Sequence, residues 1–324
     1  MSTRMRNIWN PTWYQGHHKT RSYFEGWYFK VVNADGTQAF AFIPGIAMDP
    51  AGKQHAFVQV LDGKGHKAAY HSYDATAFHA AHDRFEVHVG DNYFSPGHIR
   101  LDVPGMKGEL HFEALSPWPS SFLSPGIMGW YSFVPFMQCY HGIVSLHHSI
   151  RGELVHEGKK LGFDGGKGYT EKDWGRSFPS SWIWMQCNHF SDPGVSLTAS
   201  VARIPWLGNA FTGYIAGLWW KGKLLRFTTY TGAKLEHVSI NEDTVFYTLR
   251  DSKYRLEITA HQAKGTDLRS PLQGVMEGRV NESMDARIEM KLFELGKTPR
   301  LLLEDRGQHA GLEVAGMVEE LLLF

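Results

Sequence analysis

The sequence predicts an all-β fold of antiparallel strands with few and short helices. Along most of the chain apolar and polar residues alternate, and Gly, Pro, Asn or Asp bound the alternating segments. These segments recur at the spacing of a strand plus a turn, as in antiparallel barrels and sandwiches. Helical periodicity is scarce, and no alternation of strands with long helices is present.

The expected strands run from residue 22 to residue 295. They cover residues 22–32, 38–48, 55–62, 84–90, 98–103, 108–115, 142–150, 181–190, 195–204, 211–220, 223–231, 244–250, 254–261 and 286–295. Two short helices are expected, within residues 120–132 and 310–324. So many strands exceed one small barrel, and we therefore expect two β-domains, residues 1–165 and 166–324. The seam is expected in the glycine-rich segment 163–175, because glycines supply the backbone freedom that a crossing needs.

Charge and length exclude several classes of protein. The 324 residues include Lys+Arg 33 and Asp+Glu 33, so the net charge of +0 creates no field that attracts phosphate, and we expect no nucleic acid partner. The N-terminus lacks the apolar run of a signal or transit sequence, and no later stretch approaches the ~20 apolar residues of a membrane span. We expect a cytoplasmic protein, and peripheral access to membrane lipids stays open. Cys139 and Cys187 lie in core-like contexts and are expected to be buried free thiols.

Aromatic residues make up 14% of the chain and include 11 tryptophans. That ring surface must be packed, and part of it can wall a pocket. If residues 181–190 are extended, one face of the strand carries core residues and the other carries two indoles and two neutral amides. That second face, which we interpret as the wall of a polar-aromatic lumen, consists of Trp182, Trp184, Gln186 and Asn188.

The segment 22–32 places a carboxylate in a row of rings, because Tyr23, Glu25 and Trp27 fall on one face of an extended chain. Two interpretations are open. Glu25 pairs with a base such as Arg21 or Lys30 at a sheet edge, or apolar neighbours raise its pKa until it can donate a proton near neutral pH.

The segment 167–179 is rich in charge and is interpreted as a loop. A solvated turn is one reading of it. Trp174 would instead pack such a loop against an apolar surface, and Glu171 or Asp173 would then be a candidate acid. Its electrostatic partner would be Lys172 or Arg176.

Histidines cluster in the segment 139–152. In an extended chain His141 and His147 share one face and His148 lies on the other. Structural zinc sites usually include thiolates, and no zinc-protease motif is present, so we expect no metal here. Core packing or hydrogen bonding to a ligand is the expected role of these rings.

Four segments resemble the tocopherol cyclase family, specifically its compact bacterial members: "YFEGWYFKV", "YHGIVSLHH", "GGKGYTEKDWGRSFPSSWIWMQCNHF" and "SPLQGVMEGRVNES". The similarity follows the order of the family and covers most of the chain, and the third segment is long and specific. The family is similar in turn to carotenoid hydratases and lipocalin-like cyclases. The resemblance therefore implies two lipocalin-like antiparallel β-barrel or sandwich domains with a ligand cavity.

The plant and cyanobacterial enzymes of that family close a chroman ring on a prenylated hydroquinone without a cofactor. The resemblance implies a cofactor-independent, acid-catalysed cyclase or hydratase that acts on a prenylated aromatic or isoprenoid substrate. The candidate acids are Glu25, Glu171 and Asp173. The candidate substrate-binding residues are Tyr23, Trp27, His141, His148, Trp174, Trp182, Trp184, Gln186 and Asn188.

Two alternatives use the same aromatic residues differently. A lipocalin-like carrier of an apolar isoprenoid or lipid needs the cavity but no acid. In a purely structural role the rings serve only as core of the two β-domains. The sequence makes no prediction of substrate identity or oligomeric state.

Overall fold

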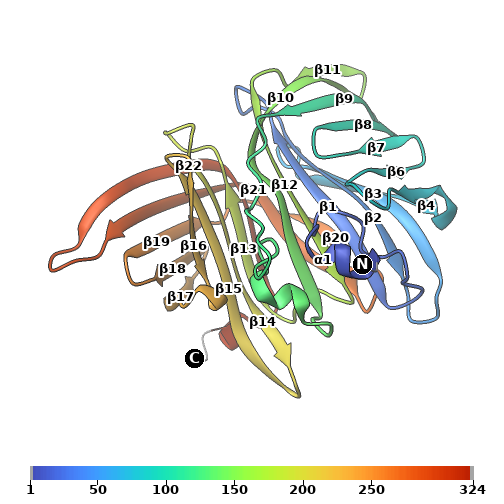
Figure 1. The fold of residues 1–324 in the computed structure, drawn as a ribbon. Helices are drawn as coiled ribbons and strands as arrows, with labels where there is room; N and C mark the ends of the chain where they lie inside the picture. Colours follow the sequence, from blue (N-terminus) through green and yellow to red (C-terminus); the bar gives the residue numbers. More distant parts are fainter. Residues whose placement is uncertain (1–2, 322–324) are drawn as a thin grey trace. The chain divides into compact units, whose positions relative to one another are not determined.

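Antiparallel strands make up nearly all of the regular structure (Figure 1), as the alternating sequence predicts. The structure is a computed structural model and describes residues 3 to 321. The chain forms two compact units, one of residues Met1–Phe178 with Leu268–Arg279 and one of residues Pro179–Asp267 with Val280–Phe324. Among the helices of the described residues, none is long and apolar enough to cross a bilayer.

A sheet of twelve strands lies in the first unit, counted over residues 3–321. Its order is β4-β3-β2-β1-β12-β10-β9-β8-β7-β6-β5, and β11 pairs with β10. The strands are β1 (Tyr23–Val32), β2 (Ala39–Met48), β3 (Gln54–Asp62), β4 (Lys67–Asp74), β5 (Phe78–Ala80), β6 (Val87–Val89), β7 (Asn92–Phe94), β8 (His98–Val103), β9 (Met106–Glu113), β10 (Cys139–His156), β11 (Lys159–Gly162) and β12 (Gly166–Gly175).

A sheet of ten strands accounts for the rest of the described strands. Its order is β16-β15-β14-β13-β22-β21-β19-β18-β17, and β20 pairs with β21. The strands are β13 (Trp182–Cys187), β14 (Ser196–Trp206), β15 (Asn209–Trp220), β16 (Lys223–Thr228), β17 (Lys234–Asn241), β18 (Thr244–Arg250), β19 (Tyr254–His261), β20 (Thr266–Leu272), β21 (Val275–Glu294) and β22 (Arg300–Ala315).

Each unit has its own hydrophobic core on one face of its sheet. In the first unit Trp27 and Phe29 of β1 pack with Phe85 and Phe112, and the Trp27 and Phe85 rings stack with centroids 5.3 Å apart. In the second unit the alternate residues of β13, from Ile183 to Cys187, join the core, which confirms the alternation expected for this strand. Burying a side chain of this size contributes about 1.5–3 kcal/mol, which is why the two-residue period fixes the register of the strands.

The segment 163–175 is the largest correction to the expected organisation. The sequence predicts a seam between domains at residues 163–175 and a charged loop at residues 167–179, but residues Gly166–Gly175 form β12, which lies between β1 and β10 in the first sheet. The two units therefore divide after Phe178 rather than after residue 165, and Leu268–Arg279 returns to the first unit. In that returning segment the backbone N–H of Arg269 donates to Gln59 at 2.9 Å.

Helices are few and short, as expected, but within residues 3–321 the two expected regions contain only short 3₁₀ turns. The one α-helix among the described residues is α1 (Thr3–Ile8), at a place where no helix is expected from the sequence. Residues 120–132 are mainly irregular and end in the 3₁₀ turn η2 (Gly129–Phe133). Residues 310–315 belong to β22, and only η4 (Val318–Leu321) is helical in that region, with residues 322–324 outside the described part. Two further 3₁₀ turns of three residues each are η1 (Ala75–Ala77) and η3 (Thr229–Thr231).

Candidate active site

The chemistry-bearing residues of the first unit gather on β12, and alternation divides them between its two faces. Trp27 of β1 lies opposite Lys172, and Glu25 lies opposite Trp174, so these four side chains share one face. Asp173 lies opposite Gly26 on one side and His141 of β10 on the other, and Glu171 falls on the same face as Asp173. The expected candidate acids therefore form two separate groups.

The first group is an ion pair between Glu25 and Lys172, which we call the buried ion pair. Nζ of Lys172 lies 2.6 Å from Oε1 of Glu25, and both side chains are 0% exposed. The carboxylate also accepts from the backbone N–H of Gln15 at 2.9 and 3.0 Å and from the hydroxyl of Tyr23. The ammonium donates to the carbonyl of Pro11 at 2.9 Å and to that of Trp13.

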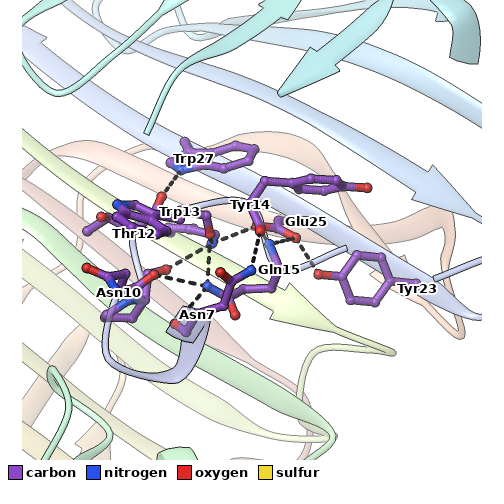
Figure 2. A network of polar contacts seen from close by, with 11 residues as sticks. Asn7, Asn10, Thr12, Trp13, Tyr14, Gln15, Tyr23, Glu25 and Trp27 are labelled. Atoms are coloured by element: carbon purple, nitrogen blue, oxygen red, sulfur yellow. Dashed lines mark hydrogen bonds and ion pairs between the residues drawn. The ribbon is translucent and has the colours of Figure 1, made fainter. Parts of the chain in front are cut away.

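Residues 7–15 hydrogen-bond to Glu25 and Trp27 (Figure 2). They cover the ion pair, whose two side chains are fully buried. The side-chain amide of Gln15 donates to the carbonyls of Asn10 and Trp13, each at 3.0 Å. The indole N–H of Trp27 donates to the carbonyl of Thr12 at 3.0 Å. The segment is thus attached to β1 and β12 through hydrogen bonds that the ion pair and its neighbours provide.

Burial governs the electrostatics of the pair. It raises the pKa of Glu25, and Lys172 with the hydrogen bonds from Tyr23 and Gln15 opposes this rise. Burial also lowers the pKa of Lys172 to about 8, opposed by Glu25 and Asp173. The Lys172 ammonium lies 5.0 Å from the ring centroid of Trp27 and 4.4 Å from that of Trp174. Every oxygen of Glu25 is engaged, and its partner is Lys172 rather than Arg21 or Lys30.

The second group, which we call the His141 cluster, consists of His141, Glu171 and Asp173. Nδ1 of His141 lies 2.8 Å from Oδ1 of Asp173, and Nε2 lies 3.5 Å from Oε2 of Glu171. The hydroxyl of Tyr169, two residues before Glu171 on the same face, donates to Oε2 of Glu171. Exposure of the side chains rises from 7% for Glu171 through 17% for His141 to 25% for Asp173.

Two carboxylates keep a proton on the imidazole. Burial alone would lower the pKa of His141, but Asp173 and Glu171 raise it to about 9, so the ring is an imidazolium at neutral pH. Burial, with the same two carboxylates, raises the pKa of the neighbouring Cys139 thiol, which therefore stays protonated. The expected partner of Glu171 and Asp173 is Lys172 or Arg176, but the ring that lies against both carboxylates is His141, and Asp173 acts on Lys172 only through its charge.

The His141 cluster also has the composition of a metal site, since its three ligand atoms lie within 4.8 Å of one another. A histidine that binds a metal must offer a lone pair on one ring nitrogen. Here both nitrogens face carboxylates, which is the arrangement of a protonated ring that donates on both sides. The geometry fits a bound proton better than a bound ion.

The other predicted residues lie elsewhere. His148 is 0% exposed on the core side of the first unit, and neither ring nitrogen has a hydrogen-bond partner among the described residues. Burial, reinforced by His147, lowers its pKa to about 3, so the ring is neutral. In the second unit the indole N–H of Trp182 donates to Glu313 at 2.7 Å.

Three further predicted residues follow Trp182 in the sequence. Trp184 and Gln186 lie opposite the core face of β13, and Asn188 follows the end of that strand. All three side chains are buried, and their part in substrate binding stays a prediction.

Tyr169 and Gln15 belong to these two groups but are not among the residues predicted from the sequence. Tyr169 has a clear signal: if "GYTEKDW" is taken as a strand, Tyr169, Glu171 and Asp173 share one face and Lys172 the other. Gln15 contributes its backbone N–H to Glu25 and its amide to the carbonyls of Asn10 and Trp13, all within ten residues, but it lies in irregular backbone where no strand or helix period applies.

Comparison with known proteins agrees with this architecture and with the resemblance. The family model described as tocopherol cyclase-like matches residues 106–316. Tocopherol cyclase of Zea mays is 28% identical over 204 residues, and a probable tocopherol cyclase of Oryza sativa subsp. japonica is 26% identical over 202 residues, both chloroplastic proteins. Each match covers 58% of this chain and 41% or 42% of the relative, so the chain spans about two fifths of the length of these relatives.

Solved structures share the fold at low sequence identity. The crystal structures of CghA and of CghA with Sch210972 align with TM-scores of 0.55 and 0.54 at 10% identity, covering 91% of this chain and 88% and 89% of theirs. The predicted all-β fold, with lipocalin-like antiparallel sheets and few short helices, is confirmed. Because the family model matches well over half of this chain, the chain belongs to the tocopherol cyclase-like family.

Proposed function

We propose that the protein is a cyclase or hydratase that protonates the alkene of a prenylated aromatic or isoprenoid substrate, with the His141 cluster as its proton source. The observation that carries the proposal is the imidazole of His141 held between the carboxyl groups of Asp173 and Glu171, at 2.8 and 3.5 Å. Membership of the tocopherol cyclase-like family supports the reaction class.

The proposed reaction involves no net oxidation or reduction of the substrate. A carboxylic acid of the cluster transfers its proton to an alkene carbon, forming a C–H bond and leaving a tertiary cation at the neighbouring carbon. The phenol oxygen then forms a C–O bond to the cation and loses its proton to the carboxylate, which gives a ring and an isomer of the substrate. In a hydratase, water forms the C–O bond to the cation and loses one proton to the carboxylate, so that one water is added to the substrate. Neither route moves electrons to or from a cofactor, and the proposal therefore includes none.

Asp173 is the proposed donor. Its carboxyl group is the most exposed member of the cluster, at 25%, whereas Glu171 is 7% exposed and is held by Tyr169. The imidazolium of His141, 2.8 Å away, would stabilise the carboxylate that proton transfer leaves behind. Glu171 is a positioning residue that helps to keep the imidazole charged.

Rings on the same face would stabilise the cation. Tyr28 lies opposite Glu171 and Phe24 lies opposite Gly175, so both point to the side of the sheet that carries the cluster. Aromatic faces attract positive charge without reacting with it.

Glu25 fits an anchoring role instead of an acid role. It is 0% exposed, its partner Lys172 is equally buried, and residues 7–15 cover it. A substrate alkene would have to displace this segment to reach it.

Access to membrane lipids is part of the proposal, and residues 114–138, which we call the aromatic loop, support it. The loop contains no charged residue. Trp9 organises it by donating to the carbonyl of Phe122 at 2.9 Å and stacking on its ring. Its exposed apolar side chains are Phe122, Leu123, Trp130, Phe133 and Phe136. An uncharged, exposed surface of this kind with Trp and Tyr suits the boundary of a bilayer, where prenylated lipids reside.

The function is tested by incubating the purified protein with an organic extract of its host and analysing the bound and released molecules by mass spectrometry. A product that differs from a consumed compound by isomerisation or by one water supports the cyclase or hydratase. A single lipid that is bound and recovered unchanged, in a protein that releases no product, contradicts catalysis and indicates a carrier. A sample without protein controls for spontaneous cyclisation.

A further inference from the structure

A pair of histidines lies on the outer face of the first sheet, away from the His141 cluster. His98 of β8 is directly opposite His111 of β9. Their rings are stacked, with centroids 4.5 Å apart and planes inclined by only 3°, so one ring must turn about its side-chain bonds before both imidazoles can face one ion. Glu109 precedes His111 by two residues on the same face, and its Oε2 lies 3.2 Å from Nε2 of His98.

We propose that His98, Glu109 and His111 bind a divalent transition-metal ion, zinc being the probe of choice. One ligand atom from each residue lies within 4.8 Å of the other two. Ligands about 2.0–2.2 Å from a tetrahedral ion lie a little over 3 Å apart, close to the 3.2 Å between His98 and Glu109. Two imidazoles and one carboxylate suit zinc and the neighbouring first-row transition metals rather than calcium or magnesium. This departs from the expectation of no metal.

The site is held by rigid strands and is open to solvent. The residues that alternate with the ligands, among them Ile99 and Leu110, are 0% exposed and belong to the core of the unit. The side chain of Glu109 is 50% exposed, so an ion can enter and keep a water ligand. Two arginines flank the site, but each is engaged elsewhere, Arg100 with the carbonyl of Asp91 at 3.4 Å and Arg151 with Glu113 at 3.2 Å.

The same sheet contains a natural comparison. His79 of β5 lies opposite His88 of β6, and Glu86 precedes His88 by two residues, which repeats the pattern of the first site. Here, however, the carboxylate of Glu86 makes two contacts with Arg84, at 3.0 and 3.1 Å. The ligand atoms are not free to converge, so this second pattern is the matched control.

The test is a calorimetric titration of zinc chloride into the full chain, without a histidine tag and in a buffer that does not chelate. We expect one tight zinc site in the wild type. His111→Ala and Glu109→Gln should each weaken it by roughly tenfold or more, since even an outer-shell partner is worth that much. The double variant His79→Ala with His88→Ala should leave it unchanged.

Cobalt(II) provides a second measurement that a general loss of stability would not reproduce. Its absorption should show a tetrahedral site without a thiolate charge-transfer band, because no cysteine is involved. Zinc affinity that is unchanged in His111→Ala, or that is lost equally in the His79 and His88 variant, would overturn the proposal. So would the absence of any tight site in the wild type.

Discussion

The imidazole of His141 sets the charge of the proposed active site. With a proton on the ring, the cluster carries two negative charges and one positive charge, and a further proton on Asp173 would make it neutral. Such a group can deliver a proton to an alkene and leave a carboxylate that is still paired with the imidazolium. The chemistry therefore depends on both carboxylates, although only one is proposed to touch the substrate.

Protonation of His141 should appear as a pH dependence of stability. Its pKa is raised from 6.5 to about 9 in the folded chain. The stabilisation is therefore complete below pH 6.5 and is lost as pH rises through about 9, and it amounts to something on the order of 3 kcal/mol. Urea unfolding measures this effect as the difference in unfolding free energy between the wild type and His141→Gln. The wild type should be the more stable protein at about pH 6, and the difference should shrink at about pH 10.

Lys172 titrates in the same range with the opposite sign, because its pKa is lowered to about 8, but it is present in both proteins and cancels in their difference. A difference in unfolding free energy that stays constant across this range would contradict the assignment.

The buried ion pair should act on stability. Glu25→Gln leaves the Lys172 ammonium buried without its counter-charge, and we expect a loss of about 3–5 kcal/mol in the free energy of unfolding. The matched control is Glu153→Gln, whose partner Lys160 is at 3.0 Å but whose side chain is 58% exposed, and it should cost less than about 1 kcal/mol. Equal urea midpoints for the two variants would show that the pair does not anchor residues 7–15.

At the scale of elements, sequence alternation located most strands because one face of each is apolar. It failed for β12, since both faces of this strand carry charged or polar residues: Glu171 and Asp173 on one, Thr170 and Lys172 on the other. These polar residues can lie in a sheet because β1, β10 and residues 7–15 provide their hydrogen-bond, charge and aromatic partners.

The same reasoning explains the site. The residue types of the candidate acids could be predicted locally, but their grouping depends on pairing between strands distant in sequence. His141 meets Asp173 only because β10 pairs with β12 in one register, and nothing local fixes that register.

The aromatic loop is predicted to bind lipid membranes through its exposed side chains. Phe122 and Leu123 are each 74% exposed at a tight turn closed by Ser121 and Ser124. The double variant Phe122→Ser with Leu123→Ser should reduce co-sedimentation with phosphatidylcholine vesicles severalfold, because burying these side chains in lipid is favourable.

The control is Leu207→Ser, a 77% exposed residue at the turn between β14 and β15. Membrane binding that survives in the loop variant, or that is absent from the wild type, would refute lipid docking by this loop. Equal loss in the control would show nonspecific adhesion and refute it as well.

For the whole molecule, the all-β class followed from the number and spacing of strands, while the division into units did not. The chain leaves the first unit after Phe178 and returns to it for Leu268–Arg279, which no seam of glycines could indicate. The match of residues 106–316 to the tocopherol cyclase-like family includes strands of both units. The fold alone does not define a substrate, so the reaction rests on the His141 cluster.

The most direct measurement is turnover in deuterated water, with the substrate found in the host extract. The wild type should form a product that carries one deuterium on carbon, delivered by the cluster. Asp173→Asn should lower the rate by about 100-fold or more. Asp102→Asn, a change at a 45% exposed carboxylate on β8, should leave it unaltered. An unlabelled product, or a full rate for a folded Asp173→Asn variant, would contradict the account.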